Sequence, residues 1–572
     1  MIAQVAFDLP LEGPFDYLIP EPLASRVAVG CRVRVSFGFR PKTGFVVGLL
    51  AQSALPKLKP VLAVEDSGNF NDLDLQFARS FSAYYGCSLG ETLAATLRNK
   101  QEAGPSVRRE GSPRFVLCRC SPADYAARIR AVREGYKKGR FLILVPDAFR
   151  GRMLSSAVDG EVKMGTRSLV FETDGRYDCV IMVDEEDASY KQEQSPMYET
   201  RQVLLQRAAI YGFDVAFVGI TPSVELMALV REGKIQELEA ARVDVPTVRL
   251  VDLSNYKFIP GLVSPPVREA LENALKAGQK GLLILNRKGS YRLTRCVDCA
   301  EILKCERCDS PLYFSRAEGK YLCRHCPFTA PGDTVCPKCQ NQSWRSQGIG
   351  VEQVQAELKK IFPTARIAAF ERETKSSARR QEVDARADIL IATQAALRFQ
   401  GQWQAGVAAF IDFDSQLNRL DMSAGFKAFS LTLHIGGMAQ TVFIQTRNIN
   451  HHVLQCLARA DMGGFYDEEL KLRQELGFSP FKHWVKISWR GPSEKSTHQA
   501  ACHVYNELAK AAPQVCLITE PAAEAVARKR GQFRFQVMVQ ADEVPPAVAF
   551  IKSAIARVKR TSGVITTINV DP

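Results

Sequence analysis

Short apolar runs recur through the middle of the chain and alternate with longer stretches whose apolar residues follow helical spacing. Runs of this kind are typical of parallel strands buried on both faces. Residues 114–450 are therefore predicted to be α/β with parallel sheets, long enough for two lobes. The runs are FLILVP (141–146), CVIMVD (179–184), VAFVGI (215–220), GLLILN (281–286), DILIAT (388–393) and AAFIDF (408–413).

The two ends of the chain follow different patterns. Residues 1–66 alternate apolar and polar positions between Pro and Gly, which predicts a small β domain with strands near 31–39 and 44–50. Residues 71–98 have helical spacing with glycine breaks, and a polar basic linker follows at 99–113. From about residue 477, helical stretches mix with strands such as FRFQVMVQ (533–540).

Length and charge narrow the class of protein. A chain of 572 residues is too long for one core, so we expect several domains. The formal charge of +13 and the pI of about 9.0 favour an anionic partner such as nucleic acid. No run of 18 apolar residues and no charged-then-apolar leader occur, so we expect a cytoplasmic, nucleoid-associated protein without a membrane partner.

Eight of the 16 cysteines form four CxxC pairs within one short segment. Two pairs supply four thiolates, which is a closed tetrahedral Zn²⁺ site with no open position for water. The segment therefore predicts two structural zinc ions, while the spacing alone permits either nested or consecutive pairing of the pairs. The pairs are Cys296/Cys299, Cys305/Cys308, Cys323/Cys326 and Cys336/Cys339.

The apolar run at 179–183 ends in three acids, Asp184, Glu185 and Glu186. This pattern is typical of the strand that holds Mg²⁺ in a nucleotide-hydrolysing motor. Such a motor also needs a phosphate loop, in which glycines let backbone N–H groups wrap the phosphates and a lysine neutralises them. The question is whether a phosphate loop precedes the run at 141–146.

The expected place for that loop is too short. Only Arg119 and Cys120 separate a predicted strand at 115–118 from a helix that starts at Ser121, and neither glycine nor lysine lies between. Asp124 would put a negative charge where a phosphate should bind. We therefore expect neither ATP nor Mg²⁺ as a cofactor, and we interpret the three acids as the solvated end of a core strand.

Several motifs follow one another along the chain: FDYLIP (15–20), GTRS (165–168), VDEEDASYKQ (183–192), NRKG (286–289), the CxxC pairs and VDP (570–572). Their order resembles the primosomal protein N′ (PriA) family of bacterial replication-restart helicases. The resemblance implies a 3′-end-binding β domain (1–68), a winged helix (69–104), a degenerate RecA-like lobe 1 (112–237), a degenerate lobe 2 (238–290 and 346–475), a double zinc insert (291–345) and an α+β C-terminal DNA-binding domain (476–572).

The resemblance also implies site residues. The DNA 3′-end pocket would comprise Phe15, Asp16, Tyr17, Gly38 and Lys59, where Asp16 accepts from the terminal hydroxyl, Tyr17 stacks on a base and Lys59 meets phosphate. The alternative is that FDY is a turn with core aromatics. The family's nested zinc pairing would join Cys296, Cys299, Cys336 and Cys339 in one site, and Cys305, Cys308, Cys323 and Cys326 in the other.

The chain departs from the family at several further places that serve ATP hydrolysis. Only 18 residues (147–164) separate LVP from GTRS, where the family has a longer segment. HIGGMAQ (434–440) replaces an arginine-bearing motif, GITPS (219–223) is one residue short, and ATQAALRFQGQW (392–403) has drifted. Asp184 and Glu185 are then a degenerate Walker B pair, and no residue is predicted to be catalytic.

The resulting hypothesis is a restart protein that binds branched or forked DNA and a nascent 3′ end and helps reload the replicative helicase, without ATPase or unwinding activity. Its expected partners are forked DNA, primosome and helicase-loading proteins, with single-stranded DNA-binding protein as a further candidate. One alternative is an active ATP-dependent 3′→5′ helicase. Another is a zinc-ribbon nucleic-acid-binding module without a role in restart.

Overall fold

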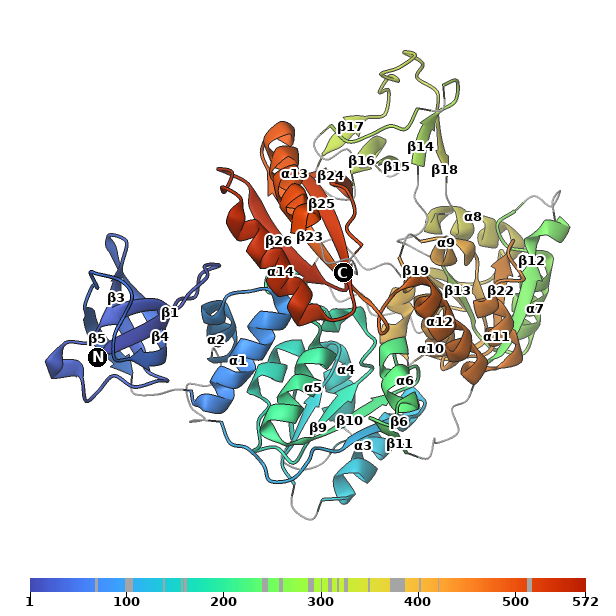
Figure 1. Ribbon diagram of the computed structural model, residues 1–572. Coiled ribbons are helices and arrows are strands. Elements are labelled where there is room, and N and C mark those ends of the chain that lie inside the picture. Colours follow the sequence, from blue (N-terminus) through green and yellow to red (C-terminus); the bar gives the residue numbers. More distant parts are fainter. Residues whose placement is uncertain are drawn as a thin grey trace.

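In the computed structural model, the chain forms an N-terminal domain, two α/β lobes, a small insert and a C-terminal domain (Figure 1). The structure describes residues 1–572 apart from 67–69, 98–105, 137–138, 156–157, 159–161, 239–244, 257–260, 286–292, 300, 307–310, 316–317, 324–327, 348–349, 371–385, 401–402, 420 and 512–516. Among the described residues, no helix is long and apolar enough to cross a bilayer.

The N-terminal domain is a five-stranded sheet that precedes two helices. Alternate positions of its strands, such as Val33 and Val35, enter a buried core. Asn71 opens the first helix with a capping box and Gly86 closes it in the left-handed conformation. The sheet order is β2 (Phe15–Leu18), β1 (Ile2–Ala6), β4 (Arg40–Leu50), β3 (Arg32–Phe37) and β5 (Val61–Asp66), followed by α1 (Asp72–Tyr85) and α2 (Leu89–Leu97). The described part of 69–104 contains these helices and no strand, so the winged helix stays a prediction.

Lobe 1 is a six-stranded parallel sheet with a core on each face. Side chains alternate along its strands between the two cores, which explains why the runs are apolar throughout. The order is β11 (Gln236–Glu237), β6 (Phe115–Arg119), β10 (Asp214–Gly219), β9 (Cys179–Val183), β7 (Phe141–Leu144) and β8 (Val162–Gly165), with helices α3 (Tyr125–Glu134), α4 (Ala148–Ser155), α5 (Thr200–Tyr211) and α6 (Val224–Arg231).

Lobe 2 repeats this architecture, and the predicted α/β multidomain class is confirmed. Its parallel sheet also divides its side chains between two cores. The order is β12 (Thr247–Asp252), β22 (Ala439–Thr446), β21 (Ala405–Phe410), β13 (Gly281–Ile284), β20 (Ile389–Ala392) and β19 (Ile367–Phe370), with helices α7 (Pro265–Lys276), α8 (Val351–Ile361), α9 (Asp414–Leu417), α10 (Ala424–Gly436), α11 (His452–Arg459) and α12 (Met462–Leu476).

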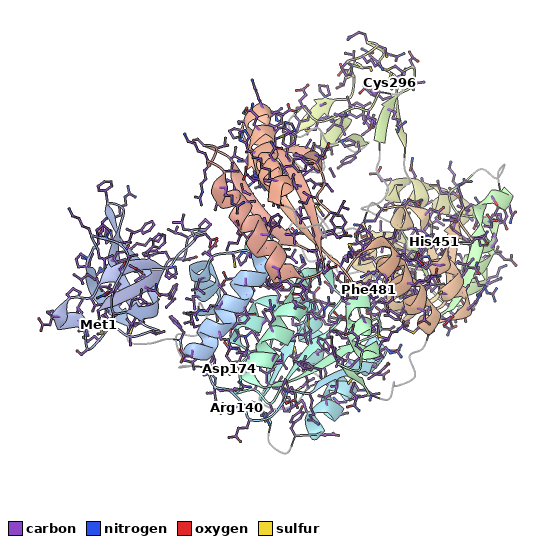
Figure 2. All side chains as sticks on the ribbon, in the orientation of Figure 1. Met1, Arg140, Asp174, Cys296, His451 and Phe481 are labelled. Carbon is purple, nitrogen blue, oxygen red and sulfur yellow. The ribbon has the colours of Figure 1, made fainter. Side chains whose placement is uncertain are left out.

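A small insert leaves lobe 2 between β13 and α8 and stands apart from the lobe, as the labelled Cys296 shows (Figure 2). It has one two-stranded and one three-stranded sheet. Their strands are β14 (Leu293–Cys296) with β18 (Trp344–Gln347), and β15 (Leu312–Ser315), β16 (Lys320–Cys323) and β17 (Thr329–Pro331).

The C-terminal domain is an antiparallel sheet with two helices, and it packs beside lobe 1 and α1 (Figure 1). One continuous cluster of buried apolar side chains joins this domain to both lobes. Among the described residues, the lobes therefore share a core. The elements are β24 (Ala522–Lys529), β25 (Gln532–Ala541), β23 (His483–Gly491), β26 (Ile565–Val570), α13 (Glu494–Ala511) and α14 (Val544–Arg557).

Candidate functional site

The carboxyl ends of β6, β10 and β9 meet where an open α/β sheet ordinarily binds its ligand. The connection after β6 is as short as the sequence predicts. A 3-10 turn over Pro122–Asp124 leads directly into α3, and the backbone N–H of Cys120 donates to the carbonyl of Gly219 at 3.1 Å. No backbone loop is left to wrap a phosphate there.

Asp184 at the end of β9 is bound on both carboxylate oxygens. The Tyr125 hydroxyl from α3 donates to Oδ1, and the Arg150 guanidinium from α4 lies 3.2 Å from Oδ2. Only 3% of Asp184 is exposed, and its φ of 49° lies in the left-handed region. The guanidinium supplies the positive charge that a metal ion would supply in a motor.

Both carboxylate oxygens of Glu185 also have partners. Arg201 of α5 lies 2.6 Å from its Oε2, and the backbone N–H of Ser223 donates to Oε1 at 2.6 Å. Arg201 also faces Glu225, which forms an ion pair with Arg473 of α12 at 2.6 Å. Glu185 is thus part of a charge network that continues from lobe 1 into lobe 2.

Glu186 reaches across to lobe 2. Its Oε1 lies 3.0 Å from His434 Nε2 on α10, and Thr221 donates to the same oxygen at 3.2 Å. Thr221 also bonds Ser430 of α10 at 2.7 Å. Burial raises the pKa of Glu186 to about 7, with the bond to His434 opposing the rise. Burial lowers the pKa of His434, but Glu186 and Asp184 together leave it above its ordinary value.

The interpretation of these acids as a solvated strand end is wrong. Asp184 and Glu185 are 3% and 4% exposed, and the Glu186 side chain is 7% exposed. The partners of these acids come from distant positions in the chain, so their burial leaves no local signal in the sequence. Only His434 carried a signal, since it opens the segment that replaces the family's arginine motif.

Asp184, Glu186 and His434 present ligand-type atoms within 4.8 Å of one another, which is close enough to surround a cation. The donor set does not favour a metal here, because Tyr125 and Arg150 already occupy both oxygens of Asp184. We therefore treat the cluster as an internal ion-pair network that fastens the lobes.

We expect the lobe interface to lose stability as pH rises. The folded-state pKa of Glu186, about 7, exceeds its ordinary value of 4.5, so its contribution is full below pH 4.5 and is lost as pH passes through 7. The raised pKa of His434 acts in the same direction. Thermal unfolding midpoints measured from pH 5.5 to 8 should therefore fall more steeply for the wild type than for Glu186→Gln. Glu232→Gln, at an exposed ion pair, is the control and should follow the wild type; equal slopes for Glu186→Gln and the wild type would refute the assignment.

The motif SYKQ after the acids has a structural role. The Lys191 ammonium donates to the carbonyls of Val570 and Asp571 at 2.8 and 3.0 Å, which fastens the C-terminal strand to lobe 1. The Tyr190 hydroxyl donates to the carbonyl of Val183 at 2.8 Å. Two of the motifs that carry the family resemblance, at 183–192 and 570–572, therefore contact each other where lobe 1 meets the C-terminal domain.

The predicted 3′-end residues all belong to the N-terminal domain, but the Tyr17 side chain lies in its core. The Phe15 ring packs 5.5 Å from Phe37, and the Lys59 ammonium donates to the carbonyl of Gly38 at 2.7 Å. Tyr17, in contrast, is 5% exposed, belongs to the core and donates to the Ser36 carbonyl at 3.2 Å. Tyr17 is thus a buried core aromatic in this structure, and its stacking on a base stays a prediction.

Asp16 has partners that the sequence analysis missed. Its half-buried carboxylate accepts from the Ser53 hydroxyl at 2.5 Å and from the Gln4 amide at 3.5 Å. Ser53 also lines a groove of about 410 Å³, so Asp16 lies beside open space that a strand end could enter. The groove is lined by Ile2, Leu18, Ala51, Gln52, Ser53, Leu55, Pro56 and Leu58.

The structure brings the first and last CxxC pairs together. The sulfur atoms of Cys296 and Cys339 are 3.4 Å apart, those of Cys299 and Cys336 are 3.5 Å apart, and all four lie within 4.8 Å. A tetrahedral Zn²⁺ with 2.3 Å bonds would separate its sulfurs by about 3.8 Å, so this four-cysteine cluster could hold a zinc ion.

The second predicted zinc site is only half described. Cys305 and Cys323 lie in one apolar cluster of the insert, with Leu312 and Tyr321. Cys308 and Cys326 lie outside the described residues, so the ligand set of this site stays a prediction.

Two family models match the ends of the chain. The 3′DNA-binding domain (3′BD) model matches residues 4–98, and the primosomal protein N C-terminal domain model matches residues 474–572. The first range covers the N-terminal sheet together with α1 and α2. The second covers the C-terminal domain.

Curated relatives align along the whole chain. The Replication restart protein PriA of Treponema pallidum is 26% identical over 100% of this chain and 99% of its own length, and that of Rickettsia conorii is 24% identical over 100% and 99%. The Thermotoga maritima protein is 24% identical over 92% of this chain and 70% of its own. Among solved structures, the E. coli DExH-box NTPase HrpB covers 71% of this chain and 53% of its own at 9% identity, with a TM-score of 0.32, too low to support an argument.

Two parallel α/β lobes that meet over a motor-type acid strand, with separate domains at both ends, define a helicase-like multidomain protein. At both ends and along its whole length the chain is similar to the PriA proteins, also called primosomal protein N′.

Proposed function

We propose that this protein recognises branched or forked DNA with an available 3′ end and helps reload the replicative helicase, without hydrolysing ATP. The observation that carries the ATP-independent part is the network around Asp184, Glu185 and Glu186. Each acid is bound by a basic side chain of the same protein: Arg150, Arg201 and His434, respectively.

Three features support DNA-end recognition. The 3′DNA-binding domain model matches residues 4–98, and the curated relatives are replication restart proteins. Asp16 lies beside a groove, with Lys59 and Gly38 on the same domain. A carboxylate can accept from a terminal hydroxyl, and it would repel a terminal phosphate.

The absence of hydrolysis has a second line of support. The alignment with the T. pallidum relative runs over 654 positions, although this chain has 572 residues, so the relative has segments without a counterpart here. We assign part of this difference in length to the short segment 147–164. The degenerate lobes then serve as a fixed scaffold between the two end domains, and the shared core fits that role.

An active ATP-dependent 3′→5′ helicase remains the second candidate. The retained acid strand at the end of β9 is the observation in its favour. It requires that Arg150 and Tyr125 both leave Asp184 when a nucleotide binds. Helicase-loading proteins and single-stranded DNA-binding protein are proposed partners on the strength of the family alone.

We propose that the insert holds two structural zinc ions. Metal analysis of the purified chain should give about two Zn²⁺ per chain, because eight thiolates fill two closed sites. Cys336→Ser should lower the content by about one, since Cys336 belongs to the described cluster. Cys502→Ser, at a half-buried thiol of α13, is the control and should keep the full content. Equal metal content in the wild type and Cys336→Ser would contradict the assignment.

Asp16→Ala tests the proposed function at the DNA end. A hydrogen bond to a charged group contributes about 1.5–3 kcal/mol, so affinity for a fork with a recessed 3′-OH should fall by about tenfold or more. Affinity for the same fork with a 3′-phosphate should not fall and should rise, because the variant no longer repels the phosphate. Fluorescence anisotropy at fixed salt measures both, since phosphate contacts make all of these affinities salt-dependent. An unchanged preference for the 3′-OH in the variant would refute the role of Asp16.

A further inference from the structure

The turn of the β3–β4 hairpin carries a fully exposed phenylalanine. Phe39 is 107% exposed, the highest value among the large apolar side chains that the structure describes. It follows Gly38, which turns the chain at a φ of 63°. Single exposed apolar residues are common and need no function, so exposure alone does not settle what Phe39 does.

The hairpin tip holds Phe39 in place. The Lys59 ammonium donates to the Gly38 carbonyl at 2.7 Å, so the next segment of the domain fixes the turn. Immediately before the turn, the Phe37 ring packs 4.7 Å from Phe7 and 5.5 Å from Phe15. The ring of Phe39 is thus presented to solvent by an anchored turn.

The charges around the tip favour a nucleic acid as its partner. Arg40 and Lys42 follow Phe39 on β4, and Lys59 lies against the turn. None of these three cations forms an ion pair with an acid among the described residues. An aromatic ring flanked by unpaired cations is the usual combination on surfaces that bind single strands, where bases stack and phosphates meet the cations.

A protein partner fits the tip less well. A stable protein interface buries roughly 800 Å² on each partner, far more than one ring offers. The residues next to Phe39 are exposed and polar or small, not a continuation of an apolar patch. A nucleobase, in contrast, matches a single ring in size and shape.

The hairpin also lies close to the proposed 3′-end site. The backbone N–H of Leu18, two residues beyond Asp16 on β2, donates to the Lys59 carbonyl at 3.0 Å, and the Lys59 ammonium donates to the Gly38 carbonyl. Phe39 directly follows Gly38, so their Cα atoms are about 3.8 Å apart. A strand whose terminal nucleotide lies at Asp16 can therefore bring a neighbouring base to the tip.

We propose that Phe39 stacks on an unpaired base next to the terminal nucleotide of the bound strand. This inference rests on the proposed 3′-end binding and adds to it a residue that senses whether the end is single-stranded. Arg40, Lys42 and Lys59 would then meet the phosphates on either side of the stacked base.

The test uses the full chain and forks whose nascent 3′ strand ends in two unpaired nucleotides, with 2-aminopurine at the penultimate position. Wild-type protein should quench the probe, and Phe39→Ala should abolish the quenching and weaken binding about five- to hundredfold. Phe39→Leu keeps an apolar side chain but should behave as Phe39→Ala, whereas Phe39→Trp should restore both signals. Leu62→Ala removes another exposed apolar side chain of the same domain and should match the wild type.

The inference and the proposed function fail in different ways. If Phe39→Ala binds and quenches as the wild type does while the preference for a 3′-OH persists, the stacking role is wrong and the proposed function stands. If Phe39→Leu retains quenching and affinity, the contact is apolar without stacking, which also overturns the inference. If wild-type protein binds 3′-OH and 3′-phosphate forks equally, the proposed function itself fails.

Discussion

The protein mixed with forked DNA and Mg·ATP is expected to release phosphate no faster than its Glu185→Gln variant. Three features should prevent ATP hydrolysis. The connection after β6 has no room for a phosphate loop, Arg150 forms an ion pair with Asp184, and the family's arginine motif is absent at 434–440. An arginine finger alone contributes about 10³–10⁵ in rate. Without a phosphate cradle, the remaining groups have no bound nucleotide to act on.

A sensitive phosphate-release assay decides this prediction. Glu185→Gln sets the background, because it removes the carboxylate that would position water while leaving Arg201 its second partner, Glu225. Fork-stimulated turnover well above that background would contradict the account. It would show that a nucleotide displaces Arg150 and Tyr125 from Asp184.

The second large effect concerns Arg201, which we expect to be essential for stability. Arg201→Ala should lower the free energy of unfolding by about 3–5 kcal/mol, because it leaves Glu185 buried and uncompensated. The Arg201 and Glu185 side chains are 14% and 3% exposed. In a working motor, substitutions around the acid strand chiefly affect turnover, whereas here they should affect folding.

Arg231→Ala is the matched control for that experiment. Arg231 also joins lobe 1 to lobe 2, through Asp467 at 2.6 Å, but its side chain is 38% and that of Asp467 69% exposed. A surface pair of this kind contributes about 1 kcal/mol or less. Urea denaturation should therefore separate the two variants clearly, and equal losses would contradict the claim that the acid strand is part of a buried network.

The sequence allowed the strands of the two lobes to be predicted well. The runs at 141–146 and 179–184 became β7 and β9, within two residues at each end. Burial on both faces makes such strands apolar throughout, which is a local signal. The helical stretch at 71–98 also split at Gly86, where a left-handed residue ends α1.

The contacts that bury the acids of the site could not be predicted from the sequence. The acids were recognised, yet their burial depends on Arg201 in α5 and on His434, which lies 248 positions beyond Glu186. Such contacts leave no periodic signal. Tyr17 shows a related difficulty, because the alternation in β2 places Asp16 and Tyr17 on opposite faces, and only the sheet decides which face is the core.

The zinc cluster could be predicted from the sequence only in part. CxxC spacing predicts thiolate pairs that share a metal, but it does not decide which pairs join. The fold decides by pairing β14 with β18, which brings Cys296 close to the final pair. Cys339 is exposed and Cys336 is buried, so the cluster lies at the surface of the insert.

We expect this PriA-like protein to recognise a DNA end without using ATP. The decisive measurement is equilibrium binding to matched forks that end in a 3′-OH or a 3′-phosphate, each with and without Mg·ATP. Binding to the 3′-OH fork should be tighter by about tenfold, the affinities should be the same with and without nucleotide, and the forks should be intact at the end. An affinity that changes with ATP, or a fork that is unwound when ATP is added, would contradict this expectation.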